Sequence, residues 1–292
     1  MLFKKEKQPQ QTPNPMLAIG SKKTLVMVYI ALTISAVAVM VPVFWLFTVS
    51  VKSLEELSQN TWGLPQEWLF SNYIAAWNGS QIDTYLMNSL YSTAVAILVT
   101  LVFVCPISFV LARYRFKGNR AIYYFAIAGM MVPIHSCIIP LYTMIGQMDA
   151  YNNLSMLGLV YGAFRIPMSI FIIESFMREI PRELDECALI DGCKTTQLFW
   201  RIILPLSKDG IVTISVLTVL ACWNELLVAM LLISDPDLKT IPSGLMSFIT
   251  EYTAEYTKLA AGVMIAIMPA IIFYAFASSK IEKGMTAGAL KG

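Results

Sequence analysis

The sequence has little charge and almost no histidine. Only 14% of its 292 residues are charged, against ~25% in an average soluble domain, and it contains a single histidine. The shortage of charge excludes an ordinary soluble enzyme, a disordered chain and a protein that binds nucleic acid. One histidine leaves no ligands for a His-rich metal site. The five cysteines form no Cys-x-x-Cys pair, so neither a zinc site nor a disulfide framework is expected.

Apolar residues are in excess, at 57% of the chain. A helix needs ~20 mostly apolar residues to cross a bilayer, where lipid satisfies no backbone hydrogen bond. Six runs are long enough, so we predict an all-α, polytopic membrane protein with six transmembrane helices. The runs cover residues 25–51, 86–112, 121–145, 157–177, 210–233 and 258–278.

Proline and glycine occur within these runs. Five of the six contain proline, which removes a backbone hydrogen bond and bends a helix. Kinked helices suit a conduit, although proline is also common in membrane helices generally. Gly158 and Gly162 are four residues apart in the fourth run and permit close contact with a neighbouring helix.

The distribution of Lys and Arg predicts the orientation. Nearly all of them lie in the N-terminal segment, in 113–120, in 178–209 and at the C-terminus; the opposite side has only Lys52, Lys239 and Lys258. Positive residues stay on the cytoplasmic side, so both termini are predicted to be cytoplasmic. The predicted parts are a disordered cytoplasmic N-terminus (1–24), a six-helix transmembrane domain (25–278) and a cytoplasmic C-terminal tail (279–292).

The inner segment 178–209 is predicted to contain two short amphipathic helices. The first runs from Pro181 to about residue 191, has acidic residues in its first turn, where the helix dipole favours them, and ends at Gly192. The second begins near Thr195 and is stopped at Leu204-Pro205. Such helices either lie on lipid headgroups or dock into a partner protein. The acidic first helix favours docking, because anionic lipid repels it. The predicted apolar stripes are Leu184, Cys187 and Ala188 on the first helix and Phe199, Ile202, Ile203 and Leu206 on the second.

One stretch of this segment resembles a known motif. The order Glu186-Cys187-Ala188-x3-Gly192-x9-Ile202-x-Leu204-Pro205 is similar to the EAA loop of ABC-importer permeases, E-A-A-x3-G-x9-I-x-L-P, with Cys187 in place of the usual alanine. From about residue 40 the chain resembles the carbohydrate-uptake permeases, and among them the shorter permease of maltose transporters. Other matching stretches are Asn88-Ser89-Leu90, Trp223-Asn224-Glu225 and the C-terminal Met285–Gly292.

The resemblance implies a non-catalytic permease subunit in a bacterial or archaeal cytoplasmic membrane, surrounded by membrane lipid. It would form part of the path for a sugar, such as a di- or oligosaccharide, delivered by an extracytoplasmic sugar-binding protein. A cytoplasmic ATPase dimer would drive it, and a second permease subunit, expected to be a different chain, would complete the pore.

The resemblance also assigns contacts with the ATPase. Glu186 would bind a basic residue in a groove of the ATPase, Ala188 would allow close packing, and Gly192 would let the chain turn. The complete coupling set is Glu186, Cys187, Ala188, Asp191, Gly192, Ile202, Leu204 and Pro205. A second contact is implied for Thr286, Ala287, Gly288 and Lys291 near the C-terminus.

A nucleotide site within the chain itself is not predicted. Residues Gly192-Cys193-Lys194-Thr195 lack the glycine that a P-loop, G-x-x-x-x-G-K-[ST], places directly before lysine. ATP and Mg are therefore expected on the partner ATPase, and no cofactor or metal in this chain. An ion-coupled secondary transporter is the alternative function, although such proteins usually show internal repeats, and none is evident here.

Polar residues inside the runs are candidates for the translocation path. An ionised side chain in hydrocarbon costs ~2.5–3.5 kcal/mol or more, so Arg165 and Glu225 should face protein or water. At 1.5 Å per residue, both lie ~12 Å from the outer edge and His135 lies ~15 Å from it. These three either line a polar layer near the outer gate, or Arg165 and Glu225 pair to join two helices. Trp223 and Asn224 either contact a sugar or serve packing.

Overall fold

The computed structural model describes residues 22–79, 81–249 and 255–289, with side chains as far as Ala275. Within these ranges the regular structure is helical. Four helices are long and apolar enough to cross a membrane, and there are six candidate spans if each of two bent helix pairs counts as one. The four are α1 (Lys22–Ser50), α4 (Ile82–Arg113), α7 (Leu154–Glu179) and the Tyr256–Ala275 part of α14 (Tyr256–Ala289).

The bent pairs and several short helices complete the described chain. One pair bends by 87° between Asn119–Met131 and Ile134–Gln147, and the other by 71° between Thr195–Leu206 and Lys208–Trp223. The first pair consists of α5 (Asn119–Ala128), η2 (Gly129–Met131), η3 (Ile134–Cys137) and α6 (Ile138–Gln147). The second consists of α9 (Thr195–Gln197), the π-helix η4 (Leu198–Ile203), α10 (Leu204–Leu206) and α11 (Lys208–Trp223). The short helices are α2 (Leu54–Gln59), α3 (Ser71–Gly79), α8 (Glu183–Ile190), α12 (Leu227–Leu232), η5 (Pro236–Leu238), α13 (Ile241–Leu245) and η6 (Met246–Phe248).

The third predicted span, 121–145, is broken rather than continuous. Val132 is extended, with φ −83° and ψ 110°, and separates η2 from η3. The ring of Pro133 disfavours a helical conformation in the residue before it, and proline has no N–H to donate. The proline was visible in the sequence, but the 87° turn that it accompanies was not.

The fifth predicted span, 210–233, is wrong in its second half, because α11 ends at Trp223. The Asn224 side chain donates to the carbonyl of Leu220 at 2.7 Å, and the Glu225 carboxylate accepts from the N–H of Val228 at 3.0 Å. These side chains satisfy backbone groups that a continuous helix would use itself. A separate helix, α12, follows the break.

Two predicted boundaries also shift. Helix α1 begins at Lys22, so residues 22–24 are helical, and the rest of the predicted disordered segment lies outside the described residues. Helix α14 passes the predicted boundary at 278 and continues to Ala289.

The closest packing in the bundle is between α4 and α7. A Cβ on Gly158 would lie 2.6 Å from the Ser92 carbonyl oxygen, and one on Gly162 would lie 2.8 Å from that of Ala96. The two helices therefore approach at a distance that only glycine permits on α7. The close contact predicted for this glycine pair is confirmed.

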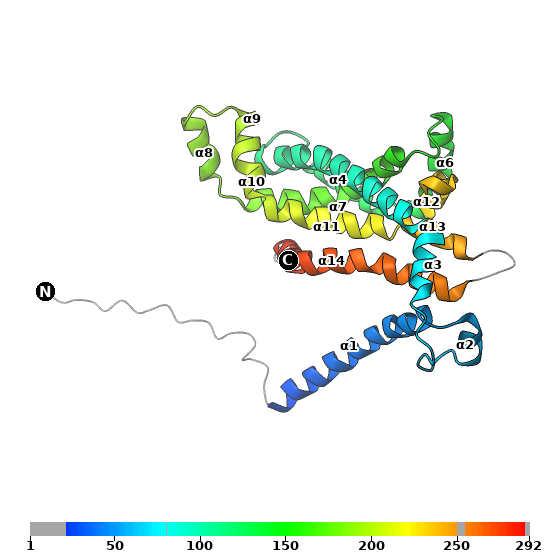
Figure 1. The fold of residues 1–292 in the computed structure, drawn as a ribbon. Helices are drawn as coiled ribbons and strands as arrows, with labels where there is room; N and C mark the ends of the chain where they lie inside the picture. The colour runs from blue at the N-terminus through cyan, green and yellow to red at the C-terminus, as the bar shows by residue number, and fades with distance from the viewer. Residues whose placement is uncertain (1–21, 80, 250–254, 290–292) are drawn as a thin grey trace.

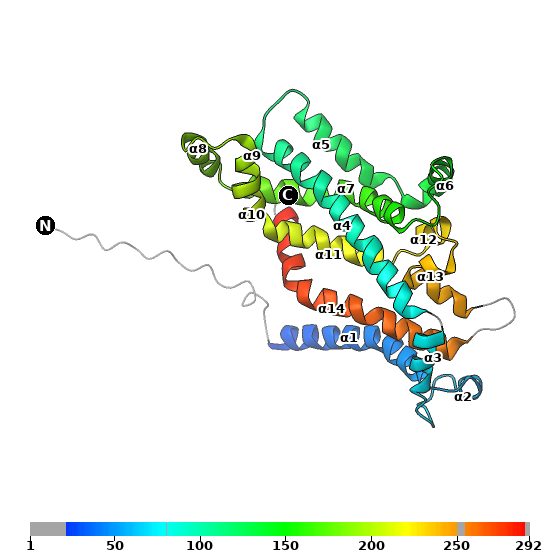
Figure 2. The same cartoon turned by 45° about the horizontal axis from the view of Figure 1, so that its top comes forward.

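The bundle has two distinct ends (Figures 1 and 2). Helices α8, α9 and α10 lie at one end, together with the start of α1 and the end of α14. Helices α2, α3, α6 and α12 lie at the other end. The chain thus presents the EAA-like segment on the same end as both of its terminal helix ends.

At the end opposite α8, the segment after α1 folds around a buried lysine. The side chain of Lys52 is fully buried, and its Nζ donates to the carbonyls of Asn60 and Gly63, each at 2.7 Å. The Asn72 side chain in turn donates to the carbonyl of Lys52 at 2.8 Å. These bonds fix the segment between α1 and α3 against the end of α1.

Candidate functional site

Helix α8 forms the centre of the EAA-like segment, and its ends follow from the sequence. Glu183, Asp185 and Glu186 occupy its first turn, near the positive end of the helix dipole. At the other end Gly192 has φ +78°, a left-handed conformation that strains other residues. The N–H of Gly192 bonds to the Leu189 carbonyl at 3.1 Å, and the N–H of Cys193 to that of Ala188 at 2.9 Å. This pair of bonds is a Schellman motif, so the predicted ending at Gly192 is confirmed.

An ion pair holds α8 against the end of α4. The Arg113 Nε lies 3.5 Å from the Asp185 carboxylate, and the two side chains are 2% and 16% exposed. Arg113 also donates from Nη1 to the carbonyl of Ile180 at 2.8 Å, just after the end of α7. One arginine therefore ties together α4, the end of α7 and the first turn of α8. The sequence interpretation placed the acidic residues of this turn at the positive end of the helix dipole and on a docking face, and it missed this anchor.

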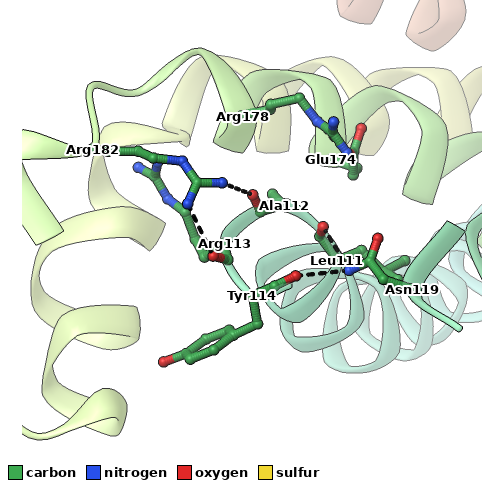
Figure 3. Close-up of polar contacts among 8 residues, drawn as sticks. All are labelled: Leu111, Ala112, Arg113, Tyr114, Asn119, Glu174, Arg178 and Arg182. Carbon is green, nitrogen blue, oxygen red and sulfur yellow. Dashed lines mark hydrogen bonds and ion pairs between the residues drawn. The ribbon is translucent and has the colours of Figure 1, made fainter. Parts of the chain in front are cut away.

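Two further side chains donate hydrogen bonds to the backbone carbonyls at the end of α4 (Figure 3). Arg182 donates to the carbonyls of Ala112 and Arg113 at 3.4 and 3.5 Å. Asn119 donates to those of Leu111 and Tyr114 at 3.1 and 2.9 Å. Nearby, Arg178 donates from Nε to the buried carboxylate of Glu174 at 2.7 Å. The junction between α4, α7 and α8 is therefore held by polar contacts from two arginines, Arg113 and Arg182, whereas the Arg178–Glu174 pair lies within α7.

The buried and exposed faces of α8 differ from the predicted stripe. Only Ala188 is buried, at 4% exposure, where it packs with residues of η4. Leu184 and Cys187, the other two members of the predicted stripe, are exposed. With a single small residue facing inward, α8 contacts its own chain through a narrow face and leaves the rest of its surface free.

The exposed face of α8 combines acidic and apolar side chains. Glu186, Cys187 and Asp191, which the resemblance assigns to contact with the ATPase, are exposed. Next to them, Leu189 and Ile190 are also exposed, Ile190 at 85%. The sequence interpretation did not single out these two residues. Their exposure could have been predicted, because they lie beside the EAA-like residues on a helix that is too short to bury two faces.

The second half of the segment is only partly as predicted. Phe199 and Ile203 are buried, Ile202 and Leu204 are half-buried, and Leu206 is exposed. The prediction that Leu206 belongs to the buried stripe is wrong, because residues 198–203 form a π-helix, whose wider turn shifts the facing residues. Pro205 is exposed, and the chain then bends by 71° into α11. The EAA-like residues therefore lie on two short helical segments, α8, which follows α7, and α9 to α10, which precede α11.

Arg165 and Glu225 come together at one small cavity. They line it with Tyr161, Cys222 and others, and its volume is about 10 Å³, room for about one water molecule. No ion pair within 4.0 Å joins these two residues in the part of the chain that the structure describes. The Glu225 carboxylate accepts the Val228 N–H instead. His135, the third member of the predicted polar layer, is exposed and does not line this cavity.

Trp223 and Asn224 differ in their surroundings. Trp223 is buried, and its indole N–H donates to the Ala266 carbonyl of α14 at 3.0 Å. Trp223 therefore joins α11 to α14, as expected if it serves packing. Asn224 is exposed, and its amide is used by the Leu220 carbonyl.

The predicted contact near the C-terminus cannot be placed in full. Thr286, Ala287 and Gly288 are part of the α14 helix, but their side chains are outside the described residues, as is the whole of Lys291.

The chain is similar to known transport proteins. The family described as "Binding-protein-dependent transport system inner membrane component" matches residues 104–283. Two permease proteins of diacetylchitobiose uptake systems from Streptomyces coelicolor are similar to the chain. NgcG is 30% identical, covering 88% of this chain and 85% of its own length, and DasC is 31% identical, covering 86% and 91%. The crystal structure of a bacterial ABC transporter that imports the acidic polysaccharide alginate contains a chain of the same fold, with a TM-score of 0.77 and 20% identity over 93% of this chain and 99% of that chain.

Proposed function

This chain belongs to the family of binding-protein-dependent transport system inner membrane components, and on that premise we propose that it is the permease subunit of an ABC importer for a sugar. A di- or oligosaccharide is the substrate class that the relatives support, since both diacetylchitobiose permeases align over most of their lengths. No feature of the described chain favours the ion-coupled alternative.

The observation that carries the proposal is the exposed, anchored helix α8. Its acidic and apolar outer face offers a partner both charge and contact area. Its buried side is tied through Arg113 to α4 and to the end of α7. A force applied to α8 by a separate ATPase would therefore reach two membrane helices directly. Glu186, Cys187, Asp191 and Gly192 would form the docking element, and Ala188 would let α8 lie close to its own chain.

The arrangement in the membrane is part of the proposal. Counting each bent pair as one, the chain would cross six times, with the α8 end in the cytoplasm. Lys and Arg concentrate in the segments at that end, which supports this orientation and cytoplasmic termini. The opposite end, with α2, α3, α6 and α12, would face the extracytoplasmic binding protein.

The assembly would contain several other components. A second permease chain would complete the pore, and lipid would cover the remaining apolar surface. That need is consistent with α1, whose apolar core is entirely unburied within the chain. ATP and Mg would be bound by the ATPase dimer, because the Gly192–Thr195 stretch is a helix end and a turn without the glycine pattern of a phosphate-binding loop.

Co-purification and uptake together test the proposal. A tagged chain expressed with its cognate ATPase and second permease is purified in detergent, and sugar uptake is measured in cells depleted of ATP or treated with an uncoupler. We expect the ATPase to co-purify and uptake to follow ATP. Glu186→Gln should weaken ATPase retention, whereas Glu183→Gln, on the same helix but outside the motif, should not. Uptake that follows an ion gradient, without a bound ATPase, would refute the proposal.

A further inference from the structure

A basic hollow lies at the junction of α4, α5 and α7. Its volume is about 760 Å³, and its lining includes four arginines, Arg115, Arg120, Arg178 and Arg182, and no acidic residue. Two of these arginines are already engaged, Arg178 by Glu174 and Arg182 by the end of α4. Arg115 and Arg120 are exposed and have no carboxylate within 4.0 Å among the described residues.

The hollow is held in a fixed shape by the turn between α4 and α5. Gly118 has φ +93°, and Asn119 bonds to two carbonyls on the opposite side of the turn. The helix α5 begins at Asn119, and its first residues, Asn119, Arg120 and Ala121, line the hollow together with the arginines. A concave surface with guanidinium donors and without a lining carboxylate fits an anion.

Two neighbouring features favour a phosphate at a membrane surface over an acidic protein segment. The exposed aromatic residues Tyr114 and Phe116 line the hollow beside Arg115, and such residues gather where a membrane meets water. The hollow also lies between the ends of two apolar helices at the basic end of the chain, and basic pockets in this position bind anionic lipid headgroups. The planar fork of arginine matches the oxygen atoms of a phosphate.

We propose that this hollow is a binding site for the phosphate group of an anionic phospholipid of the inner leaflet. The proposal rests on the proposed function, because that places the α8 end in the cytoplasm. In this position a headgroup would sit directly beside Arg182 and the junction that anchors α8, so lipid composition would bear on the coupling segment.

Lipid binding to the purified importer, with its ATPase attached, tests the proposal. Detergent-purified complex is titrated with phosphatidylglycerol or phosphatidylcholine and bound lipid is counted by native mass spectrometry. We expect preference for phosphatidylglycerol in the wild type. The double variant Arg115→Gln/Arg120→Gln should bind it roughly thirty-fold more weakly, from ~1 kcal/mol per arginine near an anionic surface and about 1.4 kcal/mol per factor of ten.

Two controls and four outcomes make the test decisive. Arg115→Lys/Arg120→Lys should retain most of the binding, and Arg201→Gln/Lys208→Gln, which removes two exposed basic residues outside the hollow, should retain all of it. Unchanged lipid binding in the first double variant overturns the proposal. So does unchanged lipid binding with loss of the ATPase, because the hollow would then be a protein-docking face. Displacement of phosphatidylglycerol by inorganic phosphate alone would overturn the lipid assignment, because the ordinary ligand of the hollow would then be the free anion. Failure of the wild type to retain ATPase would count against the proposed function, independently of the lipid result.

Discussion

Replacing Asp185 by asparagine tests whether charge holds α8 against the membrane helices. The substitution preserves the side-chain shape and leaves the bond from Arg113 to the Ile180 carbonyl in place. It leaves the Arg113 side chain, 2% exposed, without its counter-charge. Removing one partner of a buried ion pair costs ~3–5 kcal/mol. The lower end applies here, because the atoms are 3.5 Å apart and Asp185 is 16% exposed.

Hydrogen exchange measures this loss locally. A reduction of about 3 kcal/mol in the free energy of opening α8 should speed exchange of its amides by roughly a hundredfold, at about 1.4 kcal/mol per factor of ten. Peptides covering 183–193 in the purified complex report it by mass spectrometry. Glu183→Gln is the matched control, since this exposed side chain in the same turn makes no ion pair among the described residues, and surface changes stay within ~0.5 kcal/mol.

A double variant tests the charge pair from the other side. Arg113→Met with Asp185→Leu removes both charges together with the bond from Arg113 to the Ile180 carbonyl, so exchange in α8 should return part of the way to the wild-type rate. Wild-type exchange in Asp185→Asn would refute the reasoning about the anchor. A double variant as fast as the single one would show that α8 also depends on the bond from Arg113 to the Ile180 carbonyl, which the double variant lacks.

Three other predictions concern substitutions elsewhere in the chain. Gly192→Ala should destabilise the end of α8 by ~1–2 kcal/mol, which is the cost of a left-handed conformation for a residue with a Cβ. The added Cβ meets no atom within 4 Å, so no clash contributes. Urea titration of the complex measures the loss, and an unchanged unfolding midpoint would contradict it. Gly158→Ala should lower the melting temperature in detergent, because overpacking against α4 costs ~1–3 kcal/mol. Gly79→Ala, with open space around its Cβ, should have little effect, and equal shifts in the two variants would contradict the close-contact argument. Arg165→Gln and Glu225→Gln should each reduce uptake, and the double variant should not restore it, because the two residues line one cavity without forming an ion pair. Full uptake in the double variant would show that they act only as a pair.

The membrane helices could be predicted from the sequence, but the breaks within them could not be placed. Long apolar runs identify helices because lipid leaves the backbone no other partner. The same argument extends a helix too far when side chains supply the hydrogen bonds, as Asn224 and Glu225 do after α11. Pro133 was a visible break signal, but proline only ends or bends a helix, and neighbouring packing sets the angle.

The C-terminal end of α8 was predictable, whereas its start lies at Glu183, two residues after the predicted Pro181, and its orientation was not predictable. Gly192 and the acidic first turn are local signals, and both operate where the sequence places them. The buried face of an eight-residue helix rests on one or two positions, and here only Ala188 faces inward. The Arg113–Asp185 contact joins residues far apart in the chain, so no spacing rule could reveal it.

The enclosure of Lys52 bears on how the topology of this protein can be mapped chemically. Its ammonium group is shut inside the segment that follows α1, with two carbonyls as ligands, and is inaccessible to a reagent in solution. In the orientation proposed above, an amine-reactive, membrane-impermeant probe applied from outside would therefore modify Lys258, whose side chain is 37% exposed, and pass over Lys52. An unlabelled lysine at position 52 would then report a closed fold around it, and not a location on the inner side of the membrane.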